Sequence, residues 1–94
     1  MLQLETRHQK IVSEILRKYP CQFYAYGSRT KGNARHLSDL DLCYQDNLSD
    51  ALVFQIEDEF KESDLPFLVE LVSWKRMSPQ FQKLIKKNLV AINN

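Results

Sequence analysis

The chain has 94 residues, of which 44% are hydrophobic and 27% are charged, and its 13 Lys and Arg nearly balance 12 Asp and Glu. This size and composition are typical of one globular domain, so we expect residues 1–94 to form a single domain. The small net charge of +1 argues against a general nucleic-acid binder, which usually carries a clear basic excess. No apolar run approaches the roughly 20 residues that a membrane helix needs, and residues 1–10 lack the apolar core of a secretory signal.

The first half of the chain predicts a helix followed by two short strands. Apolar residues recur at helical spacing from Leu4 to Tyr19, before Pro20 interrupts the pattern. Residues 22–26 are aromatic and indicate a strand, and residues 39–44 indicate a second one. Between them lies a polar loop with room for one helical turn after Ser28.

The second half predicts a helix, a strand and a final helix. Ser49 is a suitable N-cap for a helix over residues 50–62, and the apolar segment 67–73 predicts a third strand. Ser78 and the proline after it suit the start of a last helix, whose apolar face is expected to extend to Ile92. We therefore expect an α/β (α+β) fold in which helices cover a small mixed sheet of three or more strands.

The chemistry concentrates in residues 27–42. Asp39 and Asp41 stand two residues apart at the start of a strand, so their side chains should share one face. Mg²⁺ commonly takes one or two protein carboxylates together with substrate phosphates. Gly27 and Ser28 follow the preceding strand, where glycine lets the backbone approach a ligand closely. Each motif alone is weak, because solvated strand-end aspartates and plain turns are common.

Two further observations limit this hypothesis. The Gly-x4-Gly spacing from Gly27 to Gly32 is not a P-loop, because Asn33 and Ala34 follow where that loop needs Lys and then Ser or Thr. Glu70 lies inside the apolar third strand, where a carboxylate is costly to bury unless it is paired or binds a cation. It is either the third acid of the site or a residue on a solvent-exposed face.

The order of these motifs resembles the DNA polymerase β-like nucleotidyltransferase superfamily, and the whole chain is similar to its minimal nucleotidyltransferase branch. The signature is Gly-Ser, ten residues, then Asp-x-Asp, here at Gly27, Ser28, Asp39 and Asp41. The segment 65–74 matches the family pattern Leu-Pro-Phe-x-Val-Asp-x-Val-x-Trp, except that Glu70 replaces the usual Asp. That glutamate places its carboxylate one methylene further out.

The resemblance implies a role for each residue of the motif. Gly27 and Ser28 would hold the β- and γ-phosphates of ATP, and Asp39 and Asp41 would bind Mg²⁺ in a two-metal type of site. Glu70 would be the third metal ligand and the base that accepts the proton of the nucleophile. Two arginines and a histidine are additional candidates for contacts to the nucleotide: Arg29, Arg35 and His36. For both arginines, a plain surface role stays an equal alternative.

The resemblance also implies a function. Minimal nucleotidyltransferases of this kind act as antitoxins in the cytoplasm, beside a small helical HEPN toxin that is usually a ribonuclease. The expected reaction is transfer of AMP from Mg-ATP to a hydroxyl, most simply a tyrosine of the HEPN partner. A catalytically silent module that neutralises the partner by binding is the alternative, and the Glu70 substitution favours it. Nucleic-acid binding through Lys83, Lys86 and Lys87 is a third, weaker reading, because a solvated helix face explains these residues.

Overall fold

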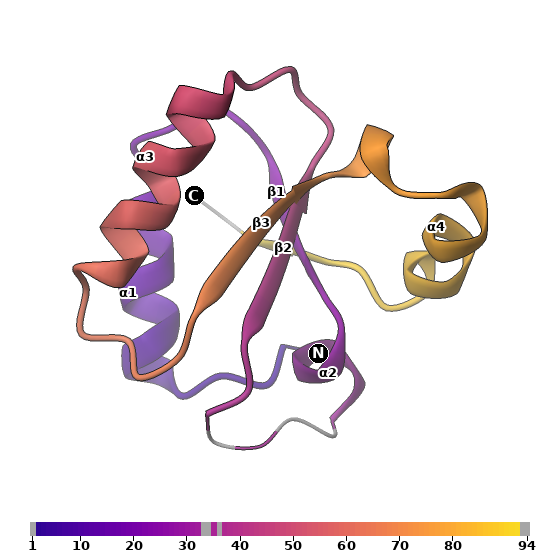
Figure 1. The fold of residues 1–94 in the computed structure, drawn as a ribbon. Helices are drawn as coiled ribbons and strands as arrows, with labels where there is room; N and C mark the ends of the chain where they lie inside the picture. The colour runs from indigo at the N-terminus through magenta and orange to yellow at the C-terminus, as the bar shows by residue number, and fades with distance from the viewer. Residues whose placement is uncertain (1, 33–34, 36, 93–94) are drawn as a thin grey trace.

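A four-stranded mixed sheet forms the centre of the molecule (Figure 1). The computed structural model describes residues 2–32, 35 and 37–92. The strand order is β3-β2-β1-β4, in which β1 runs antiparallel to both β2 and β4, and β2 runs parallel to β3. The strands are β1 (Phe23–Tyr26), β2 (Leu40–Tyr44), β3 (Val69–Ser73) and β4 (Val90–Ile92). The predicted mixed sheet of three or more strands is thus confirmed.

Helices lie on both sides of this sheet. Two long helices pack side by side on one face, and a shorter helix lies across the other (Figure 1). In chain order the helices are α1 (Thr6–Leu16), α2 (Ser28–Lys31), α3 (Asp50–Lys61), the 3-10 turn η1 (Trp74–Arg76) and α4 (Pro79–Lys86). The hydroxyl of Ser49 accepts a hydrogen bond from the Leu52 amide at 3.1 Å, as an N-cap does. In the part of the chain described here, no helix is long and apolar enough to cross a membrane.

Alternation along the strands gives the sheet two different faces. The side chains that point toward α1 and α3 build the main core, and they include Phe23, Ala25, Leu40, Leu42, Val69 and Leu71. The opposite face carries a smaller cluster with α4, made of Tyr26, Cys43, Met77 and Ile85. Residues between the core positions of β2 and β3 therefore point toward this second face.

The C-terminal segment corrects the sequence prediction. The last helix ends at Lys86 instead of continuing to Ile92, and residues 90–92 form strand β4. This strand pairs with β1, Phe23 lying opposite Ile92, and the side-chain amide of Gln22 donates to the Ile92 carbonyl at 3.0 Å. The free edge of β1 supplies backbone hydrogen bonds that a helix of the same residues would not make with the sheet. The β-branched Val90 and Ile92 suit a strand.

The other elements agree with the predictions to within a few residues. The helical turn expected after Ser28 is present as α2. The first helix is shorter than predicted, because it begins at Thr6 and ends at Leu16, with turns up to Pro20. The connection from β2 through α3 to β3 is the crossover that joins parallel neighbours.

Candidate active site

Two acidic residues stand side by side on the second face of the sheet, the half-buried Asp41 and the exposed Glu70. Asp41 in β2 pairs in register with Glu70 in the parallel strand β3. Leu40 and Leu42, on either side of Asp41, are completely buried in the main core. The Asp41 side chain therefore points to the opposite face, as Glu70 does. Asp39 lies just before β2 and is exposed.

The neighbouring acids affect the pKa of Asp41. Burial raises the pKa of Asp41 above its ordinary value, and the charges of Glu70 and Asp39 raise it further. A divalent cation would remove this repulsion, and carboxylate oxygens are ligands that Mg²⁺ prefers. Within residues 2–32, 35 and 37–92, no three His, Cys, Asp or Glu stand close enough together to form a ready metal cluster. Carboxylates are the type of ligand that Mg²⁺ binds. The carboxylates here are neighbours, but they do not by themselves form a closed coordination shell.

Gly27 brings the backbone directly against Asp41. It joins β1 to α2 with φ of +84°, a conformation that residues with a side chain rarely adopt. A Cβ atom built on Gly27 would lie 2.6 Å from Oδ2 of Asp41. Position 27 therefore requires glycine for two separate reasons, its dihedral angle and its contact with a carboxylate. The motif brings together residues 27 and 41 as the sequence suggested.

Substituting Gly27 by alanine should disturb both stability and binding. The strained backbone is expected to lower the free energy of unfolding by about 1–3 kcal/mol. The clash with Asp41 should in addition weaken binding of Mg-ATP by at least about tenfold, because an ångström of displacement is large for a catalytic group. Gly32→Ala is the matched control, since Gly32 has φ of +78° but none of the described residues places an atom within 4 Å of its added Cβ. Thermal melts and calorimetric titration measure both effects. Equal losses of affinity in the two variants would contradict the role given to Asp41.

Ser28 and Arg35 are predicted nucleotide contacts that lie within the described residues. Ser28 is half-buried and is the first residue of α2. Arg35 is exposed, and its amide donates to the Ser38 hydroxyl at 2.8 Å in a turn that leads to Asp39. His36 lies outside the described residues.

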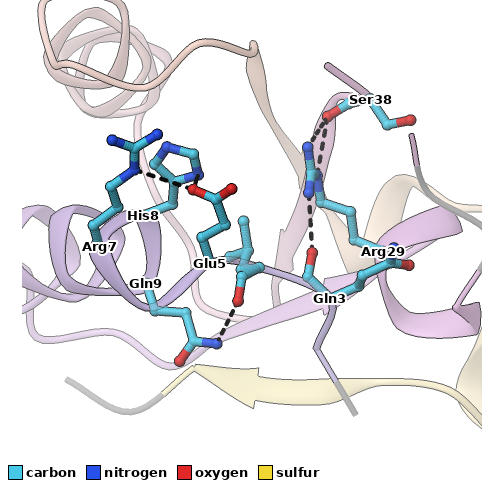
Figure 2. Close-up of polar contacts among 8 residues, drawn as sticks. Gln3, Glu5, Arg7, His8, Gln9, Arg29 and Ser38 are labelled. Atoms are coloured by element: carbon cyan, nitrogen blue, oxygen red, sulfur yellow. Dashed lines mark hydrogen bonds and ion pairs between the residues drawn. The ribbon is translucent and has the colours of Figure 1, made fainter. Parts of the chain in front are cut away.

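Arg29 has different partners from the phosphate oxygens expected for it. Its side chain is buried, and Nε and Nη2 donate to the Ser38 carbonyl at 3.0 and 2.7 Å. Nη1 donates to the Gln3 carbonyl at 3.0 Å (Figure 2). The guanidinium also stacks on the Phe67 ring, 4.1 Å from its centroid. No local pattern in the sequence connects these four positions.

Tyr26, the last residue of β1, is a further neighbour of the acids. It pairs with Asp41 across β1 and β2 and makes an edge-to-face contact with Phe81, with ring centroids 5.9 Å apart. Burial raises the pKa of Tyr26 to about 12, with further contributions from Asp41, Cys43 and Glu70. The ring therefore packs against α4, and the phenol stays neutral beside the carboxylates at physiological pH.

Comparison with known proteins agrees with this geometry. The family model described as "Polymerase beta, Nucleotidyltransferase" matches residues 9–94. The chain is 35% identical over 95 residues to "Probable protein adenylyltransferase MntA" of Haemophilus influenzae, which covers 97% of this chain and 83% of that protein.

Two solved structures share the fold. The first is a toxin–antitoxin crystal structure with AMP-PNP, at 18% identity and a TM-score of 0.70, covering 89% of this chain and 71% of that one. The second is a tri-AMPylated Shewanella oneidensis HEPN toxin in complex with an MNT antitoxin, at 16% identity and a TM-score of 0.57, with the same coverage of 89% and 71%.

Proposed function

This chain belongs to the polymerase β nucleotidyltransferase family, and on that premise we propose that it is an antitoxin that transfers AMP from Mg-ATP to a tyrosine of a HEPN-type toxin. One observation carries the proposal: Asp41 lies in register with Glu70, and the backbone of Gly27 lies directly against the Asp41 side chain. The name of the Haemophilus influenzae relative supports adenylyl transfer. The toxin–antitoxin complexes that share the fold support a HEPN partner.

Each predicted residue has a role in this reaction. Asp39 and Asp41 hold Mg²⁺, with Glu70 as the third ligand. Gly27 and Ser28 hold the β- and γ-phosphates at the end of β1. Of the two arginines predicted for the nucleotide, the exposed Arg35 offsets the phosphate charge, whereas Arg29 is buried and contributes only its positive charge. When bound, the metal ions neutralise the triphosphate and lower the pKa of the attacking hydroxyl.

Residues of the chain then direct a single displacement reaction at the α-phosphorus of ATP. The acceptor oxygen forms a bond to the α-phosphorus of ATP, and the bond from that phosphorus to the bridging oxygen of the β-phosphate breaks. Pyrophosphate leaves with the electrons of the broken bond. The proton of the acceptor hydroxyl passes to the carboxylate of Glu70, which acts as general base.

A silent binding module is the second candidate, and the identity of residue 70 favours it. Glutamate extends one methylene beyond the aspartate that the family pattern carries, which displaces the carboxylate from the position of the usual base. A displacement of about 1 Å can slow an enzyme on the order of a hundredfold. In this case the chain neutralises the toxin by association alone.

Titration calorimetry followed by an AMP-transfer assay separates the two. The chain is titrated with ATP, with and without Mg²⁺, in the absence and presence of a HEPN-type toxin. Labelled ATP then reports transfer to that protein. Mg²⁺-dependent binding and a labelled tyrosine support the enzyme. A tight complex with the HEPN protein and no label supports the silent module. If the chain shows no binding and no label is transferred, both candidates are rejected.

A cytoplasmic location forms part of the proposal. Cys21 and Cys43 are buried thiols, and burial raises the pKa of the Cys21 thiol to about 12 and of the Cys43 thiol to about 11. Buried thiols of this kind suit a reducing compartment.

A further inference from the structure

We infer that Arg29 is a positioning residue that fixes the backbone at Asp39 and so sets where the first metal-binding carboxylate stands. The inference rests on the proposed function, because Asp39 matters only where a metal ion is bound. It assigns Arg29 a task inside the protein in place of a direct contact with phosphate.

The peptide groups on both sides of Asp39 are held. On the N-terminal side, Nε and Nη2 of Arg29 both donate to the Ser38 carbonyl, at 3.0 and 2.7 Å. On the C-terminal side, the Leu40 amide donates to the Leu68 carbonyl at 2.9 Å. The second bond belongs to the start of the β2–β3 pairing, so the sheet supplies it. The first depends on one side chain from another part of the chain.

Arg29 is itself held from several directions. Nη1 donates to the Gln3 carbonyl at 3.0 Å (Figure 2), and the Gln3 amide donates back to the Arg29 carbonyl at 2.6 Å. The guanidinium lies on the face of Phe67, whose ring meets the buried His8 edge-on at 5.5 Å. The segment before α1 and the residues just before β3 therefore fix the position of this side chain.

The contacts that Arg29 makes require an arginine side chain. A guanidinium is planar and presents a fork of N–H donors, so it can donate twice to one carbonyl while it stacks on a ring. A lysine ammonium keeps the charge but lacks both the plane and the fork. Arg29 is 5% exposed, so contact with a bound phosphate would require it to give up these partners. Arg35, which is exposed, has no such constraint.

The charge of Arg29 supports the same role. Burial lowers the pKa of Arg29, and the nearby Asp39 carboxylate opposes that shift. The guanidinium thus offsets part of the negative charge at the acidic site while it holds the loop that carries Asp39. A residue that only filled space would do neither.

Arg29→Lys tests the inference, with Arg76→Lys as the matched control because the Arg76 side chain is 79% exposed. The first readout is amide hydrogen exchange in the metal-free protein, which needs no catalysis. We expect residues 38–41 to exchange at least about tenfold faster in Arg29→Lys, with exchange in α3 unchanged. The second readout is the Mg²⁺ concentration that half-saturates ATP binding. It should rise about tenfold, and excess Mg²⁺ should restore binding, because the ligand is displaced and not removed.

The outcomes separate this inference from its premise. Unchanged exchange at residues 38–41 would overturn it. If exchange is unchanged and the variant also loses ATP affinity that excess Mg²⁺ does not restore, the pattern indicates that Arg29 contacts the phosphate directly. If the wild type binds no Mg-ATP, the proposed function fails, while the exchange result still decides whether Arg29 fixes the loop. Phe67→Leu is a second variant that keeps the guanidinium and removes its ring support, and it should shift both readouts in the same direction by a smaller factor.

Discussion

Asp41→Asn is expected to reduce AMP transfer by about a thousandfold or more, equivalent to about 4 kcal/mol of transition-state stabilisation, and to make the metal-free protein more stable at neutral pH. The loss of activity follows from removing the charge of a proposed metal ligand. The gain in stability follows from the raised pKa of Asp41, which shows that its ionised form is disfavoured in the fold by burial, Glu70 and Asp39.

The sign of the pH dependence is fixed by that shift. Folded Asp41 binds a proton more tightly than the same residue in the unfolded chain. Stability is therefore lost as pH rises from the ordinary aspartate pKa of about 4 through the raised value. Asparagine carries no charge at any pH in this range. Its advantage over the wild type should be full above the raised pKa and should vanish below the ordinary one.

Thermal melts in a chelator at several pH values measure this effect, and Asp58→Asn on the exposed face of α3 is the control. Saturating Mg-ATP should then reverse the order, because ligand binding stabilises only the protein that binds it. The wild type should melt higher with Mg-ATP, whereas Asp41→Asn should not change. A variant that is less stable than the wild type without metal, or that still responds to Mg-ATP, would contradict this account of Asp41.

The acidic face could be predicted from the sequence because strand alternation is a local rule. Leu40 and Leu42 are apolar and Asp41 lies between them, so the face of Asp41 followed once β2 was recognised. The same rule placed Glu70 between Val69 and Leu71. That these two acids stand in register depends on the parallel pairing of β2 and β3, which the sequence permitted but did not determine.

Contacts between distant segments could not be predicted in this way. Residues 90–92 continue the apolar spacing of α4, so local periodicity favoured a helix. The edge of β1 decides the outcome, and it lies nearly 70 residues earlier in the chain, with Phe23 opposite Ile92. Arg29 shows the same limit, since its position in a polar loop indicated exposure. Its burial depends on Gln3 and Phe67, which reach it only in the folded protein.

Glu70→Gln is expected to lower the rate of AMP transfer by about a hundredfold or more, the range over which a general base contributes. Glutamine keeps the length and much of the shape of the side chain but can neither accept the proton nor add its charge to the metal site. Because Glu70 also raises the pKa of Asp41, the variant should be more stable than the wild type in the metal-free state. Rate and stability should thus move in opposite directions, as for Asp41→Asn.

Glu70→Asp distinguishes the base from a passive surface residue. It restores the carboxylate that the family pattern carries at this position, so transfer should stay within about tenfold of the wild type or increase. Glu14→Gln on the exposed side of α1 is the control for a change of charge elsewhere. If the Glu70→Gln variant transfers AMP as fast as the wild type, Glu70 is only an exposed strand residue and the base lies elsewhere. If the wild type is inactive and Glu70→Asp transfers AMP, the natural glutamate has silenced the site, and the protein neutralises its partner by binding.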